Sequence, residues 1–231
     1  MSPQMKPVSR RSLLAGLAAL PAMPALATNN VPVVDAALVL AVDASASIDQ
    51  GLLEFQLRGH AAAFRHKAVE EAISRSSGNG IAVILAQFAG PETLTTLVPW
   101  RVLKSGRDCE DFAATIDAAP GVFMGGSTAL GSAVVQAVAL LDAAPYRTEK
   151  RTLDIVSNGF SNAGIDPRSA RGYAAGANVT VNGLAILNEY DWLEGYFAEN
   201  VIAGRGSFVR TANDLNSFAG VLLGKLVTEM V

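Results

Sequence analysis

An apolar run over residues 36–42, Ala-Ala-Leu-Val-Leu-Ala-Val, ends abruptly at the polar motif Asp43-x-Ser45-x-Ser47. An unbroken run of this kind, rich in Val and Leu, is typical of a strand that is buried on both faces, as in a parallel sheet. A helical pattern begins near Gln50, so the motif falls on the loop that leaves the carboxyl end of the strand. In open α/β sheets, ligands bind at this edge.

Asp43, Ser45 and Ser47 offer only hard oxygen donors, and such donors favour a hard cation such as Mg²⁺. A structural interpretation is also open, because Ser and Asp commonly cap helices and either Ser47 or Asp49 would cap the helix that follows. The motif alone does not decide between a metal site and a cap, although its place at the end of a buried strand favours a functional role.

Apolar runs and helical patterns alternate along the rest of the chain, which predicts an α/β fold. The short link before residues 93–100 indicates a hairpin, so that strand is expected to run antiparallel. We therefore expect a doubly wound, mostly parallel sheet of about six strands with one antiparallel strand and helices on both faces. The further strands are expected at 81–88, 93–100, 152–156, 179–187 and 206–211, and the helices at 50–74, 108–118, 128–143, 167–176, 190–199 and from about 213 onward.

The first residues have the features of an export signal. Arg10-Arg11 precedes a short apolar stretch at 13–20, and Ala25-Leu26-Ala27 forms a small-x-small cleavage motif. The stretch is too short and too interrupted by proline to span a membrane. We expect residues 1–27 to be a signal peptide of the twin-arginine type and residues 28–231 to be exported to the periplasm or beyond, without membrane insertion after cleavage.

The net charge and the cysteine content exclude some classes of partner and of metal site. The chain carries a formal charge of −3, and loss of residues 1–27, which contain three basic residues and no acidic ones, would make it −6. This charge argues against nucleic acid and anionic membranes as partners. The single cysteine, Cys109, excludes an internal disulfide and a cysteine-based metal site.

Two further junctions carry polar clusters, Gly125-Gly126-Ser127-Thr128 and Ser157-Asn158-Gly159. In a doubly wound sheet such junctions converge on one edge, so both are expected to lie beside the Asp43 motif. Thr128 lies where the glycine loop meets a helix N-terminus. A nucleotide phosphate loop is not indicated, because its lysine and its glycine spacing are missing.

Taken in order, the three polar clusters resemble the three loops of the metal-ion-dependent adhesion site (MIDAS) of a von Willebrand factor type A domain. Other segments, among them Val98-Pro99-Trp100 and residues 182–186, resemble more narrowly a bacterial family of exported, DUF1194-like proteins. The resemblance covers nearly all of residues 28–231 and implies that they form a single von Willebrand factor A-like domain.

The resemblance also implies roles for the site residues. Ser45 and Ser47 would bind the metal directly, Asp43 would act through water, and Thr128 would join when a ligand is bound. The third loop departs from the pattern, because Asn158 stands where the family has an aspartate. Asp154 cannot replace it, since four residues of strand place it about 13 Å away. We therefore expect the site to bind Mg²⁺, or Mn²⁺ or Ca²⁺, either weakly or only when the partner's carboxylate is also present.

These observations favour a non-enzymatic periplasmic module that binds another protein, with an acidic side chain of the partner completing the metal site. One alternative is a von Willebrand factor A-type protein that binds its partner without metal. Another is a hydrolase that uses Ser45 or Ser47 as a nucleophile. A serine nucleophile needs a neighbouring base, yet His60 and His66 both lie on the first predicted helix and no G-x-S-x-G motif is present.

The cleavage motif gives a direct prediction. Replacing Ala27 by Leu puts a bulky side chain at a position that requires a small one, so processing is expected to stop at that bond. The mass of the exported protein, compared between wild type and Ala27→Leu, measures this. Processing of the variant at the same bond would contradict the assignment.

Overall fold

The computed structural model describes residues 31–75 and 77–230. The predicted signal peptide at residues 1–27 lies outside the described residues. Within these ranges, no helix has both the length and the apolar character needed to cross a lipid bilayer.

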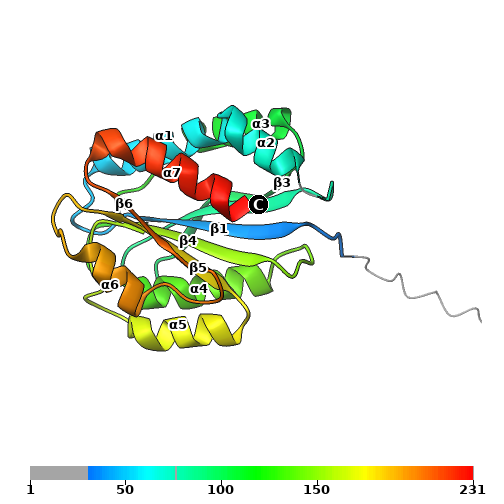
Figure 1. The fold of residues 1–231 in the computed structure, drawn as a ribbon. Helices are drawn as coiled ribbons and strands as arrows, with labels where there is room; N and C mark the ends of the chain where they lie inside the picture. The colour runs from blue at the N-terminus through cyan, green and yellow to red at the C-terminus, as the bar shows by residue number, and fades with distance from the viewer. Residues whose placement is uncertain (1–30, 76, 231) are drawn as a thin grey trace, which may run out of the picture. The chain divides into compact units, whose positions relative to one another are not determined.

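Six strands form one sheet with the order β3-β2-β1-β4-β5-β6 (Figure 1). All neighbouring pairs are parallel except β2 with β3, which is antiparallel. The predicted fold class and the antiparallel third strand are therefore confirmed. The strands are β1 (Ala36–Asp43), β2 (Ile81–Phe88), β3 (Thr95–Leu103), β4 (Arg151–Ser157), β5 (Thr180–Ile186) and β6 (Val209–Ala212).

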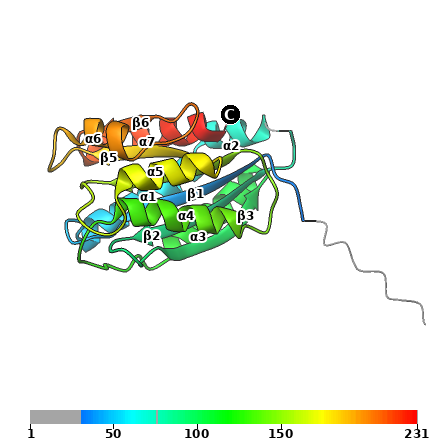
Figure 2. The ribbon, with the colours of Figure 1, turned by 90° about the horizontal axis from the view of Figure 1, so that it is seen from below.

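Helices cover both faces of the sheet, as Figures 1 and 2 show. One face carries α1, α2, α3 and α7, and the other carries α4, α5 and α6. The helices are α1 (Gln50–Phe64), α2 (Lys67–Ser74), α3 (Gly106–Ala118), α4 (Leu130–Asp142), α5 (Pro167–Gly176), α6 (Leu193–Asn200) and α7 (Leu215–Met230).

Strand β1 shows why its sequence is apolar throughout. Successive side chains of a strand point to opposite faces. Leu38, Leu40 and Val42 accordingly pack in the core under α1 and α7, and Val39 and Ala41 pack in the core under α4. Because helices cover both faces of the sheet, β1 shows no alternation of apolar and polar side chains.

The chain order changes direction between β1 and β4. From β1 the chain proceeds outward to β2 and β3, and after α4 it returns to β4 and proceeds outward on the other side. This is the topological switch point of a doubly wound sheet. The loops on its two sides run in opposite directions, and the space between them can hold a ligand. The loops after β1 and β4 are those that carry Asp43 and Asn158.

The predicted helix at 50–74 is two helices rather than one. His66 adopts an extended conformation with φ −78° and ψ 135°, and its ring Nδ1 accepts a hydrogen bond from the backbone N–H of Ala68. His66 is thus the N-cap of α2. The apolar spacing continues through the break because both helices pack on the same core, and this continuity is why the sequence pattern suggests a single helix.

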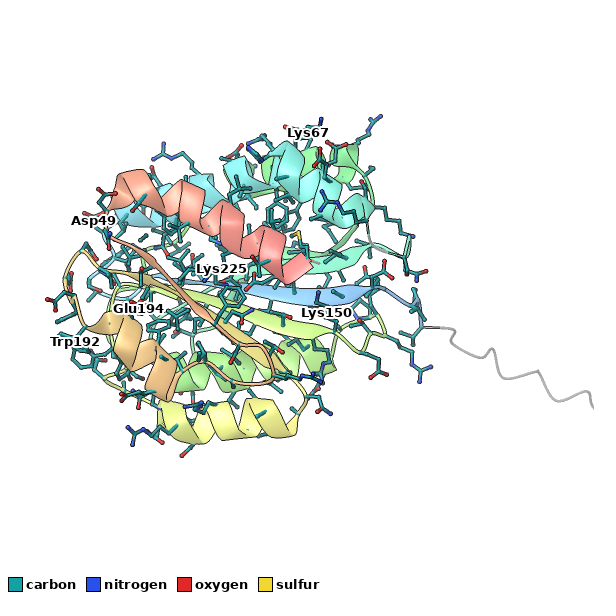
Figure 3. All side chains as sticks on the ribbon, in the orientation of Figure 1. Asp49, Lys67, Lys150, Trp192, Glu194 and Lys225 are labelled. Atoms are coloured by element: carbon teal, nitrogen blue, oxygen red, sulfur yellow. The ribbon has the colours of Figure 1, made fainter. Side chains whose placement is uncertain are left out.

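A buried ionic cluster joins α7 to the sheet (Figure 3, where Lys225 is labelled). The Lys225 ammonium lies 2.6 Å from Asp154 of β4 and also contacts Glu229 one turn further along α7. Asn182 of β5 donates to Glu229 at 2.8 Å. Asp154 and Asn182 face α7 because they occupy paired positions on adjacent strands.

The environment of this cluster shifts two pKa values. Burial, with the nearby charge of Asp154, raises the pKa of Glu229 to about 8. Burial lowers the pKa of His60, whose Nδ1 lies 2.8 Å from the carbonyl oxygen of Gln56. Glu229 therefore holds a proton near neutral pH, which leaves Lys225 and Asp154 as one balanced pair.

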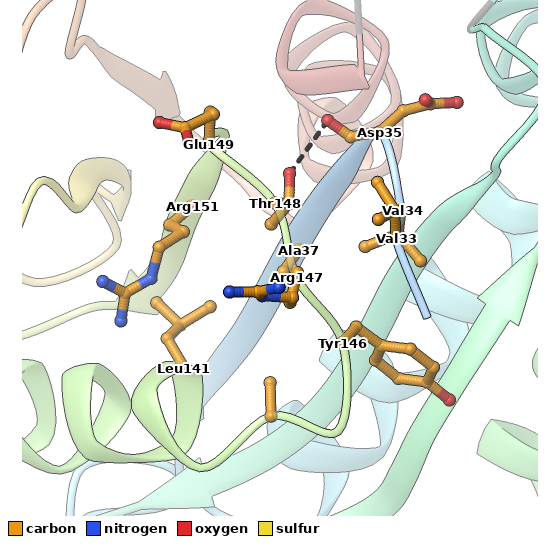
Figure 4. A pocket seen from close by; sticks show the side chains of 11 residues that line it. Val33, Val34, Asp35, Ala37, Leu141, Tyr146, Arg147, Thr148, Glu149 and Arg151 are labelled. Atoms are coloured by element: carbon orange, nitrogen blue, oxygen red, sulfur yellow. Dashed lines mark hydrogen bonds between the residues drawn. The ribbon is translucent and has the colours of Figure 1, made fainter. Parts of the chain in front are cut away.

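A hollow of about 580 Å³ lies at the other end of β1, away from the polar loops (Figure 4). It is bounded by the start of β1 and the segment between α4 and β4. Thr148 there donates to the carbonyl oxygen of Asp35 at 3.1 Å, which ties the two segments together. The hollow thus does not include the polar motifs singled out in the sequence.

The protonation of Glu229 makes stability depend on pH. Because its folded pKa lies above its unfolded value, the folded state holds an extra proton between about pH 4.5 and 8, and stability falls as pH rises through this window. We expect the free energy of unfolding of wild type, relative to Glu229→Gln, to fall by on the order of 2–4 kcal/mol from pH 5 to pH 8.5. The contribution of His60 is common to both proteins. Urea unfolding of both proteins at several pH values measures this difference. Free energies of unfolding that change with pH in the same way in both proteins would contradict the prediction.

Candidate metal centre

The first loop of the centre begins at the last residue of β1. Asp43 is fully buried, and its Oδ1 accepts a hydrogen bond of 2.8 Å from the backbone N–H of Ser45. Gln56 of α1 donates to the Asp43 carbonyl oxygen at 3.1 Å. The N-cap of α1 is Asp49, which accepts from the N–H of Leu52 at 2.7 Å. Ser47 is therefore not the cap and remains available to the centre.

The second loop, between α3 and α4, lies directly against the first. Thr128 Oγ1 donates to Ser45 Oγ at 2.9 Å, and both side chains are buried. The backbones also pair, since Ala46 N–H donates to the carbonyl oxygen of Gly126 at 3.1 Å. Gly126 has a φ of +76°, a left-handed conformation that other residues rarely adopt. The glycine loop is thus shaped to present Thr128 to Ser45.

The third loop follows β4 and closes the centre from the other side. The Oδ1 of Asn158 accepts a hydrogen bond of 2.9 Å from Ser47 Oγ. Ser157 Oγ donates to Asp43 Oδ2 and also accepts from the N–H of Gly159 at 3.0 Å. Asn158 and Ser157 are both fully buried. All five predicted residues therefore lie within one hydrogen-bonded cluster drawn from three loops.

The donor chemistry of this cluster fits a divalent hard cation. Three hydroxyls, one carboxylate and one amide oxygen converge, and each is an oxygen ligand of the type that Mg²⁺, Mn²⁺ and Ca²⁺ accept. The hydroxyl of Thr128 donates to that of Ser45, and the hydroxyl of Ser47 donates to the amide oxygen of Asn158. Among residues 31–75 and 77–230, no group of three or more His, Cys, Asp or Glu side chains could hold a metal. A cation here would depend on hydroxyl oxygens.

Asp43 carries the negative charge of the cluster at a considerable cost. Burial raises the pKa of Asp43, although hydrogen bonds from Ser157 and Ser45 act in the opposite direction. The charge of Glu189 raises it further. A cation beside Asp43 would offset this cost, because an opposite charge favours the ionised form of a buried carboxyl.

Asp154 takes no part in the centre, as the sequence spacing predicted. It lies on β4 with its side chain paired to Lys225. Asp166, which follows the third loop, accepts from the N–H of Ser169 at 3.0 Å and is the N-cap of α5. Neither carboxylate is therefore a substitute for the missing aspartate at position 158.

Sequence reasoning missed residues that hold the loops together. Asn162 Oδ1 accepts from the N–H of Thr128 at 2.9 Å, and its own N–H donates to the carbonyl oxygen of Thr128 at 2.9 Å. Gly131 permits a close approach, because a Cβ there would lie 2.1 Å from the carbonyl oxygen of Ile165. Gly131 ends the segment Gly-Ser-Thr-Ala-Leu-Gly, so the sequence motif could have indicated it. No local sequence pattern indicates Asn162.

A family model for a protein of unknown function, DUF1194, matches residues 33–231. No curated protein matches the chain.

Solved structures with a similar fold include the following three. Proximal thread matrix protein 1 from the mussel byssus, with a zinc-occupied MIDAS motif, aligns with a TM-score of 0.63 and 18% identity over 85% of this chain and 48% of that chain. The pilus adhesin SpaC from Lactobacillus rhamnosus GG aligns with a TM-score of 0.59 and 12% identity, over 85% and 30%. A von Willebrand factor type A protein from Catenulispora acidiphila aligns with a TM-score of 0.54 and 14% identity, over 85% and 43%.

At these identities the similarity shows the fold, which is that of a von Willebrand factor A domain. The chain spans about half the length of the mussel protein and less than a third of the pilus adhesin.

The buried charge of Asp43 gives a prediction about stability. Asn at this position can accept the same hydrogen bond from Ser45 and carries no charge, so Asp43→Asn is expected to raise the free energy of unfolding by about 1–2 kcal/mol at pH 8 in the presence of a chelator. Urea unfolding measures this. Asp49→Asn is the matched control, and it should change little because Asn caps a helix as well as Asp does. A loss of stability in Asp43→Asn would contradict the prediction.

Proposed function

The chain belongs to the DUF1194 family and has a von Willebrand factor A fold, and from this premise we propose that it is a non-enzymatic protein-interaction module. Its binding site is the cluster at the carboxyl edge of the sheet, where Asp43, Ser45, Ser47, Thr128 and Asn158 hold a divalent cation such as Mg²⁺. A carboxylate of the partner protein completes the coordination of that cation.

One observation carries the proposal. Side chains from three loops, widely separated in the sequence, meet through the hydrogen bonds Thr128–Ser45 and Ser47–Asn158, both of 2.9 Å. Ser45, Thr128 and Asn158 are buried and Ser47 is exposed, so the oxygen atoms of the cluster extend from the protein interior to its surface. A cation with one open position explains the arrangement and turns an acidic residue of a partner into a strong ligand.

The surface around the cluster also suits a macromolecular partner. Five of the eight exposed large hydrophobic side chains among the described residues lie on the loops α3–α4, β4–α5 and β5–α6: Val122, Phe123, Phe160, Ile165 and Trp192. Figure 3 shows Trp192 at the same end of the sheet as Asp49. Exposed apolar groups that gather around a polar site are typical of protein interfaces.

The known proteins of this fold support the type of site. The mussel matrix protein has a zinc-occupied MIDAS motif, and SpaC is a pilus adhesin. We propose a comparable role in adhesion or assembly for this chain. The signal peptide predicted at residues 1–27 supports a location in the periplasm or outside the cell, and we propose that the partner is found there too.

A serine hydrolase is disfavoured by the surroundings of the serines. Ser45 Oγ is bonded to Thr128, and Ser47 Oγ is bonded to Asn158. His60 is buried against the Gln56 carbonyl oxygen, and His66 caps α2, so neither is the base of either hydroxyl. A serine nucleophile requires a base within hydrogen-bonding reach.

Calorimetric titration of Mg²⁺ and Mn²⁺ into the purified protein tests the proposal. Wild type is expected to bind one cation, and Ser45→Ala is expected to weaken binding at least tenfold, since it removes a proposed direct ligand. Ser74→Ala is the matched control, because Ser74 is exposed on α2 and its hydroxyl donates to the carbonyl oxygen of Glu70 in the same helix. Equal binding by Ser45→Ala and wild type would show that the cation lies elsewhere. No binding by either protein would favour a partner interaction without metal.

A further inference from the structure

The proposed centre has a charge deficit. Asp43 is the only carboxylate among its five residues, since Asn158 replaces the aspartate that the family resemblance implies. Affinity for a hard divalent cation depends on the number of charged ligands. A centre with a single negative charge leaves the bound cation with a net positive charge, which is unfavourable in a largely buried position.

Glu189 lies beside the centre on a fourth loop. It follows β5, the strand next to β4, so its loop leaves the same edge of the sheet as the loop of Asn158. Its Oε1 is 3.5 Å from Nδ2 of Asn158. Glu189 is exposed, unlike Asp43 and Asn158.

Both the oxygen and the nitrogen of the Asn158 side-chain amide face a polar partner. Its Oδ1 accepts from Ser47 Oγ at 2.9 Å, and its Nδ2 faces the carboxylate of Glu189. An aspartate at this position could accept from Ser47 equally well, but it has no donor to offer Glu189 and would repel it. Asn158, unlike an aspartate at this position, can therefore donate to the carboxylate on the neighbouring loop.

We infer that Glu189 supplies the second negative charge of the cation centre and that Asn158 is the residue that holds it there. The inference rests on the proposed function and deepens it. Two carboxylates, those of Asp43 and Glu189, can together balance the charge of one divalent cation. The cation then binds before the partner arrives, and the partner's carboxylate adds to a centre that is already loaded.

The experiment titrates Mn²⁺ and Mg²⁺ by calorimetry into purified wild type, Glu189→Gln, Asn158→Asp and the double variant. Glu194→Gln is the matched control, because Glu194 is an exposed acid in the first turn of the neighbouring α6. The unfolding midpoint of each protein is measured with a chelator present. Since Glu189 is exposed, its replacement should leave this midpoint unchanged.

Glu189→Gln is expected to weaken cation binding about tenfold or more, whereas Glu194→Gln should stay within about twofold of wild type. In the Asn158→Asp background the effect of Glu189→Gln should be much smaller, because the third loop then supplies the second negative charge from its own new carboxylate. The unfolding midpoint with chelator separates the two roles, because loss of a contact that only orders the loop would change the midpoint, whereas loss of a charge of the centre changes cation binding alone.

Two results would overturn the inference. One of them would also overturn the proposed cation centre, and the other would not. Equal binding by wild type, Glu189→Gln and Glu194→Gln overturns the role of Glu189 and leaves the proposed cation centre in place. No binding by wild type or by Asn158→Asp overturns the centre itself, and the role of Glu189 with it.

Discussion

Strands β1 and β4 pair in parallel from Ala37 and Arg151 to Val42 and Val156, and the rest of the domain is arranged around this pairing. It joins the two halves of the sheet, which the chain builds outward in opposite directions. It also brings the ends of the two strands together, so that Asp43 and Ser157 are within hydrogen-bonding distance. The site is therefore a direct result of strand register: a slip of one residue would turn these side chains to the wrong face.

The cluster at this edge combines polar groups that a core would ordinarily exclude. Asp43, Ser45, Ser157 and Asn158 are all fully buried, in a region otherwise formed by apolar strands. Every hydroxyl named in the cluster has a hydrogen-bond partner, which limits the cost of their burial. The carboxylate of Asp43 is the costly member, and it is the one whose charge a cation would balance. Stability and ligand binding thus make opposite demands on this position.

The sequence predicted most of the fold and the membership of the site, because both depend on local patterns. Apolar runs that end in polar clusters indicated β1 and β4 and placed Asp43, Thr128 and Asn158 at one edge. The break at His66 was missed, since the apolar spacing continues across it. Glu189 and Asn162 were missed as well, because each lies on a loop without periodicity and contacts the centre only through the tertiary fold. Lys225 was also hidden, since its partner Asp154 lies far away in the sequence.

The ionic contacts of Lys225 have a consequence for how the last helix is seated. Apolar side chains such as Phe218, Leu222 and Leu226 fix the face that α7 turns to the sheet, but such a stripe tolerates sliding along the helix axis. Lys225 does not, because its ammonium meets Asp154 at one axial position only. A shift by one turn, about 5.4 Å, would leave Asp154 buried without a counterion and Lys225 with only its contact to Glu229 on the same helix, at a cost of roughly 3–5 kcal/mol. The pair therefore gives α7 a single longitudinal setting on the sheet.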